Sequence, residues 1–420
     1  MSCLSRRELL RALGVAAGAL VAHTFAAEEK PASAKHKGSS RSVKSAFVYT
    51  DVYVKYQYSE THPLKPYRLQ LTRDLMQSYG LLGLPQSRVV EAVTAQREEL
   101  ARFHTQEYLH ALEAANSGKY RTEYARYGLG PGDNPVFPGM YEWSLLCAGG
   151  TLQAARLVEA GEVDVAFHIA GGLHHAMRGW ASGFCYVNDP VIAITELVNK
   201  GYRVAYIDID VHHGDGVQAA FYDTDQVLTI SLHESGHFLF PGTGFEQEIG
   251  EGKGRGYAVN LPFLPGVDDA IYEEGFSAIV PPLVKAYKPE FVFTQLGVDT
   301  FHDDPLAHFD LTTAGFTRVV GQLKELAPRW IATGGGGYNL PNVARAWTLA
   351  WGVMNRVEIP DRLPEPALSL LKKAGYSGTT LRDPEISLSG PQRDRIRSEL
   401  EKSIAYLKQN VFPIHGINGK

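Results

Sequence analysis

Six short runs of apolar, β-branched and aromatic residues recur along the chain after residue 43. Within each run the apolar positions are nearly continuous, which predicts strands buried on both faces, as in a parallel sheet. The runs are Ser45–Thr50, Val163–Ile169, Arg203–Ile209, Gln226–Leu232, Phe291–Leu296 and Trp330–Thr333.

Helical patterns separate these runs, and one of them is well bounded. Asp189 is the expected N-cap, Pro190 fits the first helical position, apolar positions fall on one face over residues 191–198, and Gly201 marks the end. A strand, a long loop, a helix and a second strand in this order predict a parallel βαβ unit.

The pattern as a whole predicts an α/β protein with a wound, mainly parallel sheet. We expect one catalytic domain over residues 45–355 and a C-terminal extension over residues 356–420. A helical pattern at Gln392–Leu407 lies within that extension.

The N-terminal segment, residues 1–27, has the features of a signal peptide: a basic start, an apolar run over Ala12–Ala22 and small residues after it. Ser5–Leu10, with its paired arginines, resembles a twin-arginine export motif. We expect an exported or periplasmic protein with no transmembrane anchor in its mature form. An N-terminal extension on a cytoplasmic protein is the alternative. Residues 28–44 are polar and predict a flexible linker.

Composition narrows the function classes. The chain has 420 residues, 44% of them hydrophobic and 21% charged, which excludes an intrinsically disordered protein. The net charge of −5 argues against direct nucleic-acid binding by bulk charge. Three cysteines cannot form a disulfide framework.

Polar residues follow the predicted strands, at the edge where parallel sheets bind ligands. Asp210 and His212 are two residues apart on an extended segment, so their side chains point the same way. Asp299 follows another strand. One histidine and two carboxylates suit Zn²⁺, or Fe²⁺ and Mn²⁺, with positions left for water and substrate.

Two adjacent histidines, His174 and His175, follow a third strand, and Asp208 and Asp215 are available as partners. A carboxylate on the far nitrogen of a histidine fixes its tautomer and raises its basicity. Two such pairs beside a metal predict a general base and a general acid.

Tyr338 follows four glycines. The run lacks the Gly-Lys-Ser/Thr end of a phosphate-binding loop, which argues against nucleotide binding. A tyrosine hydroxyl brought to a metal site would instead stabilise an oxyanion.

These segments and several others together resemble the zinc-dependent histone deacetylase family, over about Val48 to Trp351. Two of the motifs, His62–Arg68 and Asp133–Gly139, look most like those of the bacterial acetoin-utilization deacetylases, and the class I enzymes are similar to a slightly lesser degree. The motifs are His62-Pro63-x-x-Pro66-x-Arg68, Asp133–Gly139, His174–Ala176, Ser182–Asp189, Asp208–Gly216, Ser231–His233, Phe240–Gly244, Gly297-x-Asp299, Asp304–Leu306 and Gly334–Asn339.

The resemblance implies the three-layer arginase/deacetylase fold and hydrolysis of acetyl-lysine side chains on proteins or peptides. Zn²⁺, or Fe²⁺ in the cell, would be held by Asp210, His212 and Asp299. His175 would be the general base toward the metal-activated water and Tyr338 would polarise the carbonyl.

The remaining family roles fall on matching positions. His174, paired with Asp208, would be an electrostatic partner, and Asp215 would orient His175. The substrate-binding residues would be Gly183, Phe184, Phe240 and Leu306 along the acyl-lysine tunnel, Asp133 at its rim and Arg68 in an inner cavity.

The family also binds K⁺ or Na⁺, and the resemblance implies two such sites. The first would use Asp208, Asp210, His212, Ser231 and Leu232. The second would use Phe221, Thr224, Val227 and Tyr257.

Three departures from the family pattern concern the substrate. Leu239 replaces an aromatic residue before Phe240, Trp180 is bulky, and His302-Asp303 is locally polar. An acetylpolyamine or other small acetylated amine is therefore an alternative substrate, although the apolar Leu306 favours lysine. A non-catalytic acyl-lysine binding protein is a further alternative, and it would be expected to lack a ligand or Tyr338.

Overall fold

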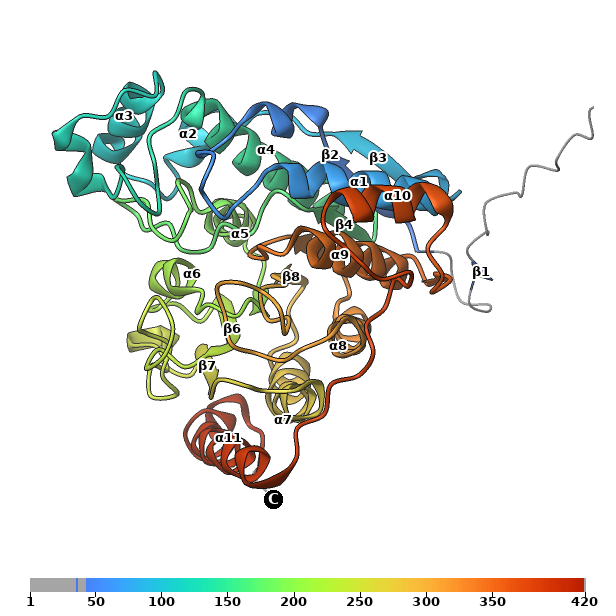
Figure 1. The fold of residues 1–420 in the computed structure, drawn as a ribbon. Helices are drawn as coiled ribbons and strands as arrows, with labels where there is room; N and C mark the ends of the chain where they lie inside the picture. Colours follow the sequence, from blue (N-terminus) through green and yellow to red (C-terminus); the bar gives the residue numbers. More distant parts are fainter. Residues whose placement is uncertain (1–34, 37–42, 419–420) are drawn as a thin grey trace, which may run out of the picture. The chain divides into compact units, whose positions relative to one another are not determined.

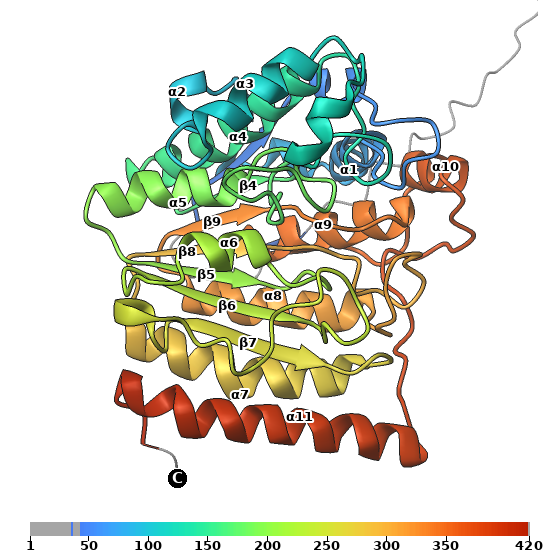
Figure 2. The same ribbon diagram turned by 90° about the vertical axis from the view of Figure 1, so that its left-hand side faces the viewer.

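The computed structural model describes residues 35–36 and 43–418, and the predicted signal peptide lies outside them, as does most of the predicted linker. The centre is an eight-stranded sheet in the order β3-β2-β4-β9-β8-β5-β6-β7, and every neighbouring pair is parallel. Figure 2 shows β4, β9, β8, β5, β6 and β7 following one another across the sheet. Its strands are β2 Ser45–Tyr49, β3 Ser87–Glu91, β4 Val165–His168, β5 Val204–Asp208, β6 Val227–Glu234, β7 Ala258–Phe263, β8 Phe291–Gln295 and β9 Trp330–Thr333.

Helices cover both faces of this sheet, which makes three layers (Figure 1). On one face α4 packs against β2, β4 and β9, and α5 packs against β5. On the other face α7 packs against β5 and β6, and α7, α8, α9 and α1 pack side by side in that order. The α-helices are α1 Tyr67–Ser78, α2 Arg97–Leu100, α3 Gln106–Ala115, α4 Met140–Glu159, α5 Asp189–Asn199, α6 Asp215–Ala220, α7 Asp269–Tyr287, α8 Thr313–Leu326, α9 Leu340–Met354, α10 Glu365–Lys373 and α11 Gly390–Asn410.

Short elements complete the chain. A two-stranded antiparallel sheet joins β1 Lys35–His36 to β10 Val357–Glu358. The 3₁₀ turns are Asp51–Lys55, Leu81–Gly83, Thr122–Tyr127, Gly252–Gly254 and Phe412–His415.

All six predicted strands are present, and the two strands of the eight-stranded sheet that were not predicted, β3 and β7, are its edges. β3 is polar and partly exposed, so it has no continuous apolar run. β7 contains Pro262, which an edge strand tolerates because one side of its backbone makes no ladder bonds.

The N-cap prediction at Asp189 is wrong by one residue. The Asn188 side chain accepts the Val191 N–H 3.1 Å away and caps α5. Asp189 is fully buried, and its carboxylate accepts the N–H groups of Gly172 and Leu173. Asp189 therefore fixes the loop that leads into the histidine pair.

The C-terminal segment packs on the same body of the protein. α10 lies against α1, and α11 lies against α7 and the edge strand β7 (Figure 2). Covering β7 in this way protects an otherwise open strand edge. The residue limits 45–355 and 356–420 stay predictions.

Candidate active site

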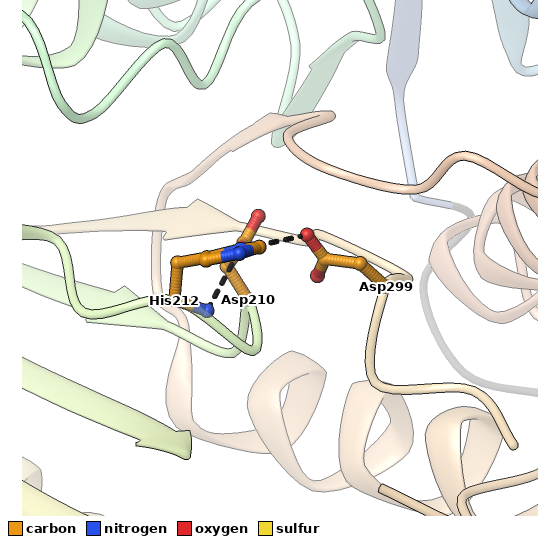
Figure 3. Close-up of side chains that lie close together, drawn as sticks. All are labelled: Asp210, His212 and Asp299. Carbon is orange, nitrogen blue, oxygen red and sulfur yellow. Dashed lines mark hydrogen bonds and ion pairs between the residues drawn. The ribbon is translucent and has the colours of Figure 1, made fainter. Parts of the chain in front are cut away.

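Three predicted metal ligands meet at the carboxyl end of the sheet. Asp210 and His212 follow β5 and Asp299 follows β8, and Figure 3 shows their side chains pointing at one another. The His212 Nδ1 lies 3.1 Å from Asp210 Oδ1 and 3.1 Å from Asp299 Oδ2. All three side chains are buried, and one donor atom from each lies within 4.8 Å of the others.

The outer oxygens of this triad are held by neighbours. Asp210 Oδ2 accepts from Gln295 Nε2 at 2.6 Å and from the Gly336 N–H at 2.7 Å, while Asp299 Oδ1 accepts the Val211 N–H at 3.0 Å. Each carboxylate therefore turns its other oxygen toward the common centre. The sequence analysis missed Gln295, although a polar residue that ends an apolar strand could have pointed to it.

The donor set fits a divalent cation. Burial and the neighbouring Asp210 raise the pKa of Asp299 to about 6, and the two carboxylates overcome burial to raise the pKa of His212 to about 10. The centre of the triad thus attracts positive charge. Carboxylate and imidazole donors at this spacing are those that Zn²⁺ and Fe²⁺ prefer.

The two predicted His–Asp pairs are formed. His174 Nδ1 lies 2.7 Å from Asp208 Oδ2, and His175 Nδ1 lies 2.7 Å from Asp215 Oδ1. The two Nε2 atoms lie 3.0 Å apart, and both residues line the cavity beside the triad.

The two rings titrate in opposite directions. Burial disfavours charge on His174, but Asp208 and Asp210 outweigh it and raise the pKa of His174 to about 9. Burial and the charge on His174 lower the pKa of His175 to about 4 against the pull of Asp215. His175 is thus neutral near pH 7 and can accept a proton.

Tyr338 reaches the same cavity from the glycine loop after β9. Its backbone N–H donates to Asp304 Oδ2 at 2.7 Å, and its ring stands edge-on to Phe184, with 5.6 Å between centroids. Burial raises the pKa of Tyr338 well above its usual range, so its hydroxyl stays a neutral donor.

Arg68 also binds the backbone of this glycine loop. The buried Arg68 guanidinium donates to Gly335 O at 2.7 Å and to Gly337 O at 2.8 Å. Arg68 therefore holds the backbone on both sides of Gly336, whose N–H reaches Asp210.

A narrow cavity is lined by the histidine pair, by two of the predicted metal ligands and by Tyr338. The residues that line it are Leu64, Gly172, Leu173, His174, His175, Gly183, Cys185, Asp210, His212, Gly335, Gly336 and Tyr338. Phe240 stands edge-on to His175, with 5.0 Å between ring centroids, and is 42% exposed, so it extends the wall outward.

Two predicted substrate residues lie farther out. Asp133 is exposed in a shallow depression that also contains Gly183, and its backbone oxygen lies 3.1 Å from His62 Nε2. Leu306 is half-buried next to Asp304, and its N–H donates to the Asp304 carboxylate. Leu306 is not among the residues that line the cavity.

The residues named for the first monovalent cation lie on adjacent strands. Asp208 and Ser231 are register partners on β5 and β6, and Asp210 and His212 follow on the same segment. The residues named for the second monovalent cation site are Tyr257 and three residues of the 221–227 segment. Within that segment the Thr224 N–H donates to Phe221 O.

The fold and the site together define a metal-dependent hydrolase with two His–Asp pairs and a tyrosine. Residues 62–354 match the family model described as the histone deacetylase domain. The chain belongs to the histone deacetylase family. The expected fold and deacetylase class are thereby confirmed.

The curated relatives and solved structures that are similar to this chain are also histone deacetylases or their homologues. Histone deacetylase RPD3 of Saccharomyces cerevisiae is 41% identical over 322 residues, covering 76% of this chain and 73% of the relative. Human histone deacetylase 1 is 40% identical over 334 residues, covering 79% of this chain and 68% of the relative. A crystal structure of an HDAC homologue complexed with SAHA is 36% identical with a TM-score of 0.80, covering 88% of this chain and 100% of that one. Another, of an HDAC homologue from Aquifex aeolicus, has the same identity and TM-score.

Among the residues that the structure describes, no helix combines the length and the hydropathy needed to span a membrane.

Proposed function

We propose that the protein removes acetyl groups from acetyl-lysine side chains of proteins or peptides. The observation that carries this is that Asp210, His212, His175 and Tyr338 line one narrow cavity, and that Asp299 lies against Asp210 and His212. These groups supply a cation site, a base and an oxyanion donor for amide hydrolysis.

We assign the cation site to Zn²⁺, with Fe²⁺ as the alternative in the cell. Asp210, His212 and Asp299 would hold this ion, which would supply Lewis-acid chemistry to the substrate carbonyl and to the attacking water.

His175 moves the proton in this proposal. His175 accepts it at Nε2 from the attacking water, because Asp215 fixes its Nδ1 and its low pKa leaves the ring neutral. The same proton is then donated to the leaving lysine amine. His174, held by Asp208, carries positive charge next to the reacting atoms and stabilises the negative charge that develops there.

Tyr338 donates a hydrogen bond to the oxyanion that forms at the carbonyl. In other enzymes a single donor of this kind lowers the activation free energy by roughly 3 kcal/mol. Arg68 and Asp304 keep the backbone of Tyr338 in place for this contact.

The entrance suits a slim apolar stem. Gly183, Phe184 and Phe240 contact the four methylenes of lysine, which bury well once the amine is acylated. We assign Asp133 to the substrate backbone at the rim and Leu306 to the outer wall. K⁺ or Na⁺ binds at the two positions named above, and the ion at the first supports the end of β5 and the residues after it, Asp208 and Asp210.

We also propose that residues 1–27 direct the protein out of the cytoplasm. Its acetylated substrate then lies in the periplasm or beyond.

The test measures acetate release by the purified, zinc-loaded protein from an acetyl-lysine peptide and from acetylspermidine side by side. Faster turnover of the peptide is the expected result. Faster turnover of acetylspermidine would make the protein a small-amide deacetylase. Release from neither substrate would overturn the proposal.

A further inference from the structure

The catalytic Tyr338 lies between two cavities. One is the active-site cavity, and the other is a larger cavity between the start of α9, residues 301–303 and the C-terminal segment 374–386. Side chains do not fill the space on that second side of the loop. A run of four glycines also has little rigidity of its own. The position of Tyr338 must therefore be fixed by directional contacts with its surroundings.

A chain of hydrogen bonds along the wall of the second cavity supplies such contacts. Asp303 accepts the side-chain amides of Asn339, at 3.0 Å, and of Asn342. Asn339 directly follows Tyr338 and caps α9, and Asp304 holds the Tyr338 N–H. The Asp303–Asp304 dipeptide thus fixes both the tyrosine and the first turn of the helix that follows it.

This series of hydrogen bonds continues into the C-terminal segment 374–386. Asn342 Oδ1 accepts from Arg345 one helical turn later, at 2.6 Å, and Arg345 Nη1 donates to Asp383 at 2.5 Å. Arg345 is only 2% exposed, and its guanidinium also lies 4.5 Å from the centre of the Tyr376 ring. Asp383 is anchored in turn on α8, where its Oδ2 accepts the Thr313 N–H and its own N–H donates to the Thr313 hydroxyl.

We propose that Asp383 is a positioning residue for Tyr338, acting through Arg345, Asn342 and Asp303. Through Asp383 alone, the C-terminal segment then helps to position Tyr338. This inference rests on the proposed role of Tyr338 in the reaction.

A double-mutant cycle tests it, with kcat and KM measured on the acetyl-lysine peptide. Asp383→Ala should lower kcat roughly 10- to 100-fold, the range expected for small misplacement of a catalytic group, with KM changed less than about twofold. In a Tyr338→Phe background the same substitution should lower kcat by less than about twofold, because the group it positions is already absent.

Asp361→Ala is the matched control. Asp361 also holds the C-terminal segment, since its carboxylate accepts the Arg382 N–H at 2.8 Å, but its partners lie within that segment. The kcat of the Asp361→Ala variant should equal that of the wild type. If Asp383→Ala does not fold, as judged by its melting temperature, Asn342→Ala takes its place in the cycle.

The outcomes separate the two proposals. An equal loss of kcat in both backgrounds, or full activity of a folded Asp383→Ala variant, would overturn the inference alone. Unchanged kcat in Tyr338→Phe would overturn the role of Tyr338 under the proposed function.

Discussion

His174 and His175 face each other through their Nε2 atoms, 3.0 Å apart, while a different aspartate holds each Nδ1. The two rings are thus equivalent in geometry and differ in charge. His174 has three carboxylates in its surroundings, Asp208, Asp210 and Asp215, whereas His175 has the positive charge of His174. This asymmetry supports the proposed role of His175 as the base.

Asp215→Asn should abolish this arrangement without disturbing the metal. The amide cannot stabilise a protonated His175, and it favours the wrong tautomer, so kcat should fall at least about 100-fold. Bound zinc should stay at one ion per chain. The exposed Asp223 is a control, and Asp223→Asn should retain full kcat. Equal activity of the two variants would remove Asp215 from the mechanism.

Gly183→Ala should block the same histidine sterically. A Cβ at residue 183 would lie 2.4 Å from the His175 ring, and the residue has φ +50°, which disfavours any side chain. We expect kcat to fall at least about 100-fold because His175 must shift. Gly179→Ala, four residues away, meets nothing within 4 Å and should retain wild-type kcat. A fully active Gly183→Ala variant would show that the entrance is wider than described.

The free energy of unfolding should decrease as the pH is lowered, because His168 is a buried histidine outside the proposed active site. His168 Nε2 lies 2.6 Å from the Tyr53 hydroxyl, and burial lowers the pKa of His168 to about 3. An unfolded histidine titrates near 6.5. Between these values the unfolded chain takes up a proton that the folded protein excludes, so the free energy of unfolding decreases as the pH drops below about 6.5.

Denaturant unfolding of wild type and His168→Gln measures this effect. The His168 contribution has a slope of about 1.4 kcal/mol per pH unit below pH 6.5. The wild type should lose more stability than the variant over the same interval. His302→Gln, at a histidine whose side chain is 58% exposed, should follow the wild type. Parallel curves for wild type and His168→Gln would contradict the assignment.

Metal should stabilise the folded protein through the triad. Zn²⁺ at about 1,000 times its dissociation constant adds roughly 4 kcal/mol to the free energy of unfolding, which raises the melting temperature by several degrees. Asp299→Ala should show no such rise. The same rise in Asp299→Ala would place the zinc elsewhere.

The sequence predicts the six inner strands of the sheet, and it predicts that Asp210, His212 and Asp299 lie close together at the end of the sheet. The six inner strands are apolar on both faces, so their pattern is strong, whereas the edge strands β3 and β7 are interrupted by charges or by Pro262. Asp210, His212 and Asp299 are recognisable as candidate ligands because each lies a few residues after the end of a strand.

Other contacts depend on tertiary structure and are not visible in the sequence. Arg345 and Asp383 are 38 residues apart and meet only because the C-terminal segment folds back over α9. Gln295 contacts Asp210 because β8 lies beside β5. Asn188 replaces Asp189 as the cap because Asp189 is drawn inward to the Gly172 loop.

The central claim is that one metal centre at Asp210, His212 and Asp299 hydrolyses acetyl-lysine amides. The most direct test measures bound zinc and acetate release from an acetyl-lysine peptide in the same samples of wild type and Asp210→Ala. We predict one zinc per chain with turnover in the wild type, and loss of both together in the variant. Turnover by Asp210→Ala without bound metal, or full zinc occupancy in that variant, would contradict the account.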